Sequence, residues 1–357
     1  MSETILVFPG GLPEALHFRA EAEARGAKVV GASSLKFDPA ASAYKTWTLL
    51  PYAHRDDFAA DLEAVLKEHQ IDAVFSPHEV VSGVLVELLA KIAPAVRLIS
   101  ANPVMAQEQV YIELMARARR GDGADWFQMD GAKPALSVIE RAGLLRLVDS
   151  IPGMTDLDKI AAVIETMRYA PPGDVVEIGS WWGRSAALML LLARRYQVGP
   201  VLCVDPWSLD FIDQGVAVLD QASRRLDMDI ALRVFEINLS PIAGGQLNYI
   251  RAPSTKGAEL YRPGLTVTTE AFGETRYSGD IAFLHIDGNH TFDAVSADAA
   301  AWTPKVRPGG WIVFDDYVWA FGDGPKRVGD AFLESQADRI EVSFVIGTAL
   351  FIRLADR

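Results

Sequence analysis

The stretch 174–185 constrains this chain most, because it reads as a strand that turns directly into a helix. Its β-branched valines and isoleucine suit a buried strand, whereas the alanines and leucines of 186–193 are good helix formers. Gly179 and Gly183 fall on the turn, where the start of a helix offers unpaired N–H groups and the positive end of its dipole. The turn therefore predicts a site for an anionic or carboxylate-bearing ligand.

Two features separate this turn from a dinucleotide-binding loop. It lacks the third glycine of Gly-x-Gly-x-x-Gly, and Glu177 precedes the first glycine, where a pyrophosphate would meet negative charge. Further on, the apolar strand 201–204 ends in Asp205, which is placed to accept hydrogen bonds from ribose hydroxyls. A nucleoside with a charged amino-acid tail satisfies both features, so we expect S-adenosylmethionine. A βαβ turn without a ligand is the alternative.

The segment 177–185 resembles the first motif of class I S-adenosylmethionine-dependent methyltransferases, in the form found in catechol-type O-methyltransferases. Val-Asp-Pro-Trp at 204–207, His-Ile-Asp-Gly-Asn-His at 285–290 and Phe-Asp-Asp-Tyr at 314–317 resemble, more narrowly, the macrocin and mycinamicin sugar O-methyltransferases. The resemblance covers about residues 150–357. It implies a set of cofactor-binding residues, namely Glu177, Gly179, Ser180, Gly183, Ser185, Asp205, Trp207 and Ser254.

Three carboxylates are expected at the ends of two neighbouring strands. Asp287 ends the apolar strand 281–286, and Asp315 and Asp316 follow strand 311–314. Open α/β sheets bind ligands outside the carboxyl ends of their strands, and hard oxygen ligands suit Mg²⁺ better than Zn²⁺. The resemblance implies a divalent ion at these three aspartates, although some of the sugar enzymes have Glu at the first position of the pair. A solvated strand end and a polar turn are the alternatives.

His290 is the candidate general base, because the resembling enzymes keep their base at this position. Methyl transfer to an alcohol requires removal of the hydroxyl proton, assisted by a cation that stabilises the developing alkoxide. His285 lies inside an apolar strand and is expected to be a hydrogen-bonded core histidine. Trp207 and Ser254 could contact the adenine or serve only in packing.

The alternation of strand and helix patterns predicts two α/β domains separated by helices. Residues 1–105 form a smaller domain that resembles the one preceding the nucleotide-binding part of ATP-grasp enzymes, and its Gly10-Gly11 could hold a phosphate or simply make a turn. Residues 106–168 read as a helical connector that covers the cofactor or builds an oligomer interface. Residues 169–357 predict a Rossmann-like methyltransferase domain, with a seven-stranded sheet whose last strand is antiparallel. Insertions at 206–246 and 255–277 are candidate lids or acceptor walls.

The composition narrows the class of partner. A net charge of −13 argues against nucleic acid and anionic membranes, since binding phosphates draws on clustered Lys and Arg. Cys203 is the only cysteine, so no intramolecular disulfide can form, and we expect a core thiol in a reducing, cytoplasmic compartment. No apolar run reaches the length of a membrane span.

Together these features predict a Mg²⁺-dependent O-methyltransferase that moves the methyl group of S-adenosylmethionine to a hydroxyl of a small molecule, a sugar or glycosylated metabolite by resemblance. Two alternatives stay open. One is a metal-free N- or C-methyltransferase in which the three aspartates are structural. The other is a module that binds S-adenosylmethionine without catalysis.

Overall fold

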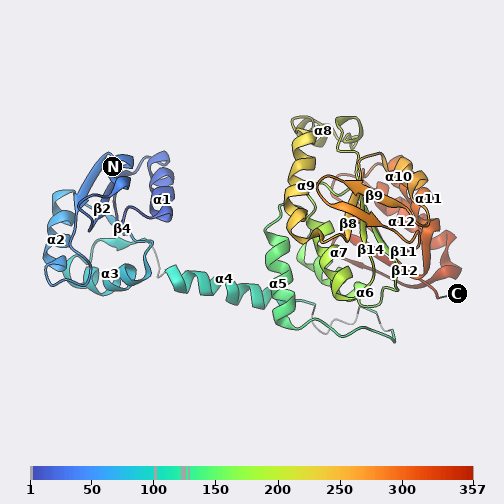
Figure 1. Ribbon diagram of the computed structural model, residues 1–357, viewed down its shortest axis with the longest axis horizontal. Coiled ribbons are helices and arrows are strands. Elements are labelled where there is room, and N and C mark those ends of the chain that lie inside the picture. Colours follow the sequence, from blue (N-terminus) through green and yellow to red (C-terminus); the bar gives the residue numbers. More distant parts are fainter. Residues whose placement is uncertain (1–2, 100–102, 122–125, 128, 357) are drawn as a thin grey trace. The chain divides into compact units, whose positions relative to one another are not determined.

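The computed structural model describes residues 3–99, 103–121, 126–127 and 129–356 and divides the chain into two compact units, Met1–Glu113 and Leu114–Arg357. The first unit is blue to cyan in Figure 1 and the second runs from green to red. The division falls inside helix α4 (Pro103–Ala118). The predicted α/β class is confirmed, with a five-stranded sheet in the first unit and a seven-stranded sheet in the second.

The first unit is a five-stranded parallel sheet in the order β3-β2-β1-β4-β5. Its elements are β1 (Thr4–Val7), α1 (Pro13–Ala24), β2 (Lys28–Ser33), β3 (Thr46–Leu49), α2 (Phe58–Glu68), β4 (Ala73–Phe75), α3 (Glu79–Ile92) and β5 (Arg97–Leu98). The Gly10-Gly11 turn after β1 packs tightly, because a Cβ on Gly11 would lie 2.8 Å from a carboxylate oxygen of Asp38. That negative charge favours the turn over a phosphate site.

The second unit holds a seven-stranded sheet in the order β13-β14-β12-β11-β6-β7-β8, in which β14 is antiparallel to both neighbours and the five strands from β12 to β8 are parallel. The strands of this sheet are β6 (Asp174–Ile178), β7 (Val201–Val204), β8 (Leu247–Ile250), β11 (Ile281–Ile286), β12 (Val306–Phe314), β13 (Ile340–Ile346) and β14 (Ala349–Leu354). Two further strands of the unit, β9 (Thr266–Thr269) and β10 (Gly273–Arg276), pair only with each other among the described strands. Its helices are α5 (Val138–Asp149), α6 (Leu157–Met167), α7 (Arg184–Arg195), α8 (Ala217–Ser223), α9 (Met228–Ala243), α10 (Ser254–Leu260), α11 (Phe292–Trp302) and α12 (Gly324–Ser335). The predicted seven-stranded sheet with an antiparallel last strand is confirmed.

Alternate residues of each central strand enter two separate cores, because successive side chains of a strand point to opposite faces. Val175, Cys203 and Phe283 pack toward α5, α6, α7 and α9. Val176 and Leu284 pack toward α10, α11 and α12. Cys203 is a fully buried free thiol, as expected. The helices α5 and α6 lie within the second unit and pack against α7, where the sequence predicted a separate connector.

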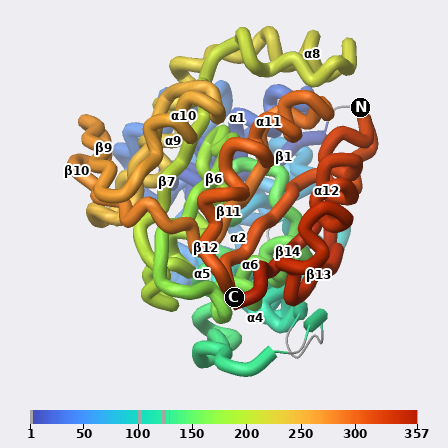
Figure 2. The backbone as a smooth tube through the Cα atoms, turned by 90° about the vertical axis from the view of Figure 1, so that its right-hand side faces the viewer, coloured from blue at the N-terminus to red at the C-terminus, as the bar shows by residue number. Residues whose placement is uncertain are grey.

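The two insertions have regular structure. The segment 255–277 contains α10 and the β9–β10 hairpin, which lies at the β8 edge of the sheet (Figure 2). The segment 206–246 contains α8 and α9. Within the described part of the chain, no helix is long and apolar enough to cross a membrane.

Candidate active site

A cavity of about 750 Å³ opens at the carboxyl ends of the strands of the second unit. The predicted residues Gly179, Ser180, Gly183, Ser185, Asp205, Trp207, Ser254, Asp287, His290, Asp315 and Asp316 all line it. They lie in the loops after five strands, β6, β7, β8, β11 and β12, or in the first turn of the helix that follows, and they meet at one edge because these strands are parallel. Of the predicted site residues, Glu177 alone is absent from this wall.

The glycine loop is shaped by packing between chain segments. Gly179 (φ +78°) and Gly183 (φ +88°) adopt the left-handed backbone conformation. A Cβ on Gly179 would lie 2.1 Å from the carbonyl oxygen of Asp287, and one on Gly183 would lie 3.0 Å from Leu239 and Phe235. Both glycines are therefore required by the fold itself, which lets the β6 loop lie directly on the loop after β11.

Asp205 ties this loop to the end of β7. Its carboxylate accepts hydrogen bonds from the backbone N–H groups of Ser180 (2.9 Å), Trp181 (3.0 Å) and Trp207 (2.8 Å). Burial raises the pKa of Asp205, although the three N–H donors oppose the shift. These three hydrogen bonds hold the two loops together, and the contact with a ribose that the sequence suggested stays a prediction.

Trp207 and Ser254 mainly serve packing. Trp207 is almost fully buried, donates from Nε1 to the carbonyl oxygen of Trp181 (3.0 Å) and packs against Phe235 and Tyr249. Ser254 Oγ accepts from Trp302 Nε1 at 2.9 Å. Both still contribute to the cavity wall.

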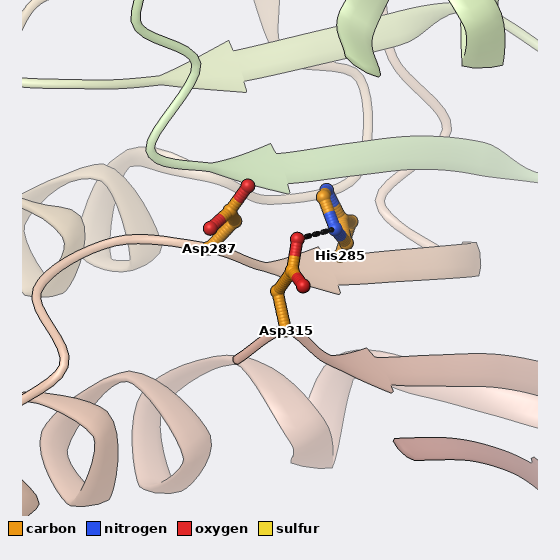
Figure 3. Close-up of side chains that lie close together, drawn as sticks. All are labelled: His285, Asp287 and Asp315. Atoms are coloured by element: carbon orange, nitrogen blue, oxygen red, sulfur yellow. Dashed lines mark hydrogen bonds and ion pairs between the residues drawn. The ribbon is translucent and has the colours of Figure 1, made fainter. Parts of the chain in front are cut away.

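Glu177 and His285 belong to a polar row beneath the cavity. In the sheet register Glu177 lies between Cys203 of β7 and His285 of β11, so all three side chains point to the same face. His285 Nδ1 lies 3.1 Å from Glu177 Oε1, and its Nε2 lies 3.2 Å from Asp315 Oδ2 (Figure 3). Burial lowers the pKa of His285, but these two carboxylates outweigh it and raise the pKa to about 10. His285 is the hydrogen-bonded core histidine that the sequence predicted.

Lys159 of α6 completes the row. Its Nζ donates to Asp315 Oδ2 at 2.5 Å, and the two side chains are 5% and 1% exposed. Burial lowers the pKa of Lys159, yet Asp315 and Asp287 more than compensate and the pKa lies above its usual value. In turn, burial raises the pKa of Asp315, but Lys159 and His285 hold it well below its usual range. Asp315 is therefore a charged carboxylate neutralised within the fold.

Asp287, His290 and Asp316 form the open part of the cluster. One ligand atom of each lies within 4.8 Å of the others, with His290 Nε2 3.0 Å from Asp316 Oδ2 and 3.8 Å from Asp287 Oδ1. Burial and the neighbouring Asp315 raise the pKa of Asp287 to about 7. Burial lowers the pKa of His290, but the carboxylates of Asp287 and Asp316 outweigh burial and raise this pKa above its ordinary value. These shifts arise because the fold gathers more negative than positive charge here.

Backbone strain marks the same wall. Asp316 (φ +51°), Trp181 (φ +47°) and Trp207 (φ +37°) are three of the five non-glycine residues with positive φ that the described backbone contains. Such conformations are costly for L-residues and persist where surrounding contacts impose them, which is most often at functional sites.

Sequence reasoning missed three features of the site. Lys159 lies in a helix with no motif, and only tertiary packing brings it to Asp315. Asp298 of α11 lines the cavity with its carboxylate buried, which raises its pKa to about 6 although a hydrogen bond from Ser254 opposes the shift. Asn289, in the loop after β11 that carries His290, joins this loop to the insertion 206–246. It donates hydrogen bonds to the carbonyl oxygens of Asp213 (2.7 Å) and Phe211 (3.3 Å). In the sequence, only the polar residues of the Asp-Gly-Asn-His motif at 287–290 could have indicated this contact.

The residues of the cavity wall fit both a nucleoside-containing cofactor and a divalent ion, but one of the three predicted ion ligands is already paired. Ser180 and Trp182 line the cavity, and Ser180 Oγ and Trp182 Nε1 are buried polar atoms for which the described residues supply no hydrogen bond of ordinary geometry, so both are candidate donors to a ligand. Asp287 and Asp316 offer carboxylate oxygens to the cavity, which suffices for Mg²⁺, an ion that commonly keeps several waters and one or two carboxylates. Asp315 already carries Lys159, so an ion would have to compete with the ammonium group for it.

Comparison with known proteins agrees with this architecture. Residues 176–317 match a family described as methyltransferase domain. Over 168 residues the chain is 25% identical to the 8-demethyl-8-(2,3-dimethoxy-α-L-rhamnosyl)-tetracenomycin-C 4′-O-methyltransferase of Streptomyces olivaceus, and the match covers 46% of this chain and 61% of that protein.

Two solved methyltransferase structures are among those that match part of the chain. The O-methyltransferase NovP is 17% identical, with a TM-score of 0.41 over 70% of this chain and 99% of NovP. MycE, a methyltransferase from the mycinamycin biosynthetic pathway solved with Mg and SAH, is 18% identical, with a TM-score of 0.36 over 61% of this chain and 57% of MycE. The family match and the strand order together identify residues 176–317 as a methyltransferase domain within a Rossmann-like α/β unit.

Proposed function

We propose that this protein transfers the methyl group of S-adenosylmethionine to a hydroxyl of a small molecule, with Mg²⁺ held by Asp287 and Asp316. The observation that carries the proposal is the placement of Asp287, His290 and Asp316 within 4.8 Å of one another in a cavity that also contains the glycine loop. Base, cation ligands and cofactor loop are then the parts that O-methylation requires.

The residues divide the work as follows. Ser180, Trp182 and the loop held by Asp205 would bind the cofactor, which supplies an electrophilic methyl group. Mg²⁺ would lower the pKa of the acceptor hydroxyl and stabilise its alkoxide. His290 would take the hydroxyl proton at Nε2, and Asp316, 3.0 Å away, would stabilise the resulting imidazolium. Most of the remaining catalysis is the positioning of the acceptor against the methyl group.

The acceptor class follows from the charge of the wall. Its two fixed cations are both engaged, since Lys159 pairs with Asp315 and Arg184 pairs with Asp149 at 2.9 Å. Aromatic surface comes from the exposed Phe211 and the partly buried Trp319, the latter with its ring centroid 4.7 Å from that of His290. An acidic wall with aromatic faces suits an uncharged sugar attached to an apolar group and repels phosphates. The tetracenomycin relative is named for a rhamnosyl acceptor of this kind.

The test is methyl transfer from labelled S-adenosylmethionine to a panel of neutral glycosides, with nucleotide-linked sugars as the charged comparison. We expect activity with the neutral set, a sharp loss in EDTA and recovery with Mg²⁺. His290→Ala should slow transfer by about 100-fold to 10,000-fold while S-adenosylhomocysteine still binds.

One observation favours a second candidate, a metal-free methyltransferase. Lys159 neutralises Asp315 without any ion, so the cluster already contains a fixed cation. Full activity in chelator would establish this candidate and remove the metal from the proposal. Saturable binding of S-adenosylhomocysteine without transfer to any acceptor of the panel would favour a binding module.

A further inference from the structure

The three aspartates at the ends of β11 and β12 are not equivalent toward a cation. Asp287 and Asp316 have side chains that are 27% and 25% exposed at the cavity, whereas Asp315 is 1% exposed. Four donors already surround the Asp315 carboxylate. Oδ2 accepts from Lys159 Nζ (2.5 Å) and His285 Nε2 (3.2 Å), and Oδ1 accepts from the Asp316 N–H (2.8 Å) and Thr348 Oγ1 (3.4 Å).

Lys159 is held firmly in this position. It lies in the first turn of α6, whose N-terminus is capped by the Asp156 side chain at the Lys159 N–H (2.8 Å), and α6 packs against α7 and β13. Asp287 and Asp316 also stabilise its charged form, in addition to Asp315. The ammonium is therefore a permanent positive charge beside the place where a divalent ion would bind.

We propose that Lys159 limits the affinity of this site for divalent cations, because its ammonium occupies Asp315 and leaves only Asp287 and Asp316 as carboxylate ligands. The inference rests on the metal site of the proposed function and concerns which residues form it. Two effects act together: the ammonium takes one ligand away, and its charge repels an approaching cation in a region of low dielectric. Asp315 thus positions Lys159 and His285 and does not hold the ion.

The experiment is calorimetric titration of MgCl₂ into the full-length protein loaded with S-adenosylhomocysteine. Lys159→Met keeps the length of the side chain but removes the charge, and it should tighten Mg²⁺ binding by about 10-fold or more, because Asp315 is released and the repulsion disappears. The matched control is Lys133→Met. Lys133 is partly buried, donates to the carbonyl oxygen of Ala170 at 2.9 Å and is not part of the cavity wall, so its removal should leave Mg²⁺ affinity unchanged.

A double variant, Lys159→Met with Asp315→Asn, removes the buried pair as a neutral unit and avoids leaving one charge unpartnered. If the pair contributes neither a ligand nor net charge, this variant binds Mg²⁺ within about threefold of the wild type. A loss of tenfold or more would make Asp315 a ligand of the ion and overturn the inference, as would unchanged or weaker binding by Lys159→Met. Should the single variant fail to fold, the double variant decides alone.

The outcomes also separate this inference from the proposed function. If the wild type binds Mg²⁺ and the variants behave otherwise than expected, the metal site stands and the role of Lys159 falls. If the wild type binds no Mg²⁺ but Lys159→Met does, the inference stands and the native enzyme is metal-free. If neither protein binds Mg²⁺ while S-adenosylhomocysteine binds both, the inference and the metal fall together, and the cofactor assignment remains.

Discussion

At the scale of single residues, Glu177 is the sharpest test of how the site is divided between binding and support. Its side chain is fully buried against His285 and is absent from the cavity wall. We expect Glu177→Gln to lower the free energy of unfolding by about 1–3 kcal/mol, since a buried charged hydrogen bond is lost. Affinity for S-adenosylhomocysteine should change less than about threefold. Denaturant unfolding and calorimetry measure both, with the exposed Glu259→Gln as the control.

The opposite result, weaker cofactor binding with unchanged stability, would restore the role that the family resemblance implies for Glu177.

Asp298 predicts a pH-dependent stability of the ligand-free protein. Burial raises its pKa from 3.8 to about 6 in the fold, whereas in the unfolded chain the carboxyl ionises near its ordinary value. Between these two values the unfolded state loses its proton first, so the wild type loses stability as pH rises. The Asp298→Asn variant does not lose stability in this way, because its side-chain amide does not ionise. Its advantage over the wild type should be near zero below pH 4 and grow to at most about 3 kcal/mol above pH 7. Unfolding curves at pH 4 and pH 7.5 with a constant difference would refute this account.

The site residues that could be predicted from sequence are those attached to strand ends. Asp287, Asp315 and His290 follow strands that pair in parallel, so the topology alone brings them together. The contacts of these side chains could not be predicted in the same way. Asp205 binds the glycine loop after β6 and Asp315 binds Lys159, and both contacts depend on tertiary packing that no spacing in the sequence encodes.

At the scale of elements, side-chain hydrogen bonds join the insertion 206–246 to the loop after β11, which carries His290. One side chain comes from each segment. Asn289 Nδ2 donates to the carbonyl oxygens of Phe211 and Asp213, and Gln214 Oε1 accepts from the His290 N–H at 2.7 Å. Asn289→Ala should raise hydrogen exchange of amides 209–216 by about 10-fold, because two hydrogen bonds hold this segment closed. Mass spectrometry measures the exchange.

Asn238→Ala is the matched control for this exchange experiment. Asn238 donates to the carbonyl oxygen of Trp182 at 2.9 Å, elsewhere on the insertion, so its loss should leave amides 209–216 as they are. Equal exchange in the wild type and Asn289→Ala would show that the segment is held by other contacts.

Strands that are buried on both faces could be predicted, and some partly exposed ones could not. The strands β6, β7 and β11 are buried along their whole length and mostly apolar, and they were predicted to within a residue. The strands β3 and β9 are short and partly exposed, with threonines that fit a loop as well as a sheet. Their pairing is decided by neighbouring strands rather than by their own composition.

At the scale of the whole molecule, the cavity belongs to one unit. Every described residue of its wall lies between Pro152 and Trp319, inside the unit Leu114–Arg357. Its core is also its own, since two apolar clusters on either face of the seven-stranded sheet draw only on residues from Leu114 onward. This arrangement predicts that the second unit can fold and bind the cofactor alone.

A chain that begins at Pro103 tests this independence and keeps α4 intact, because Leu114 and Ala118 of that helix belong to the core of the second unit. We expect cooperative unfolding and an affinity for S-adenosylhomocysteine within about threefold of the full chain, since no wall residue is removed. A folded truncation that binds about tenfold more weakly would instead mean that residues 1–102 act on the cavity in solution. Transfer to the neutral glycosides, measured on both proteins, then separates the two possible tasks of the first unit. Lost transfer with intact cofactor binding would assign the first unit to the acceptor, whereas equal transfer would place its task outside the reaction.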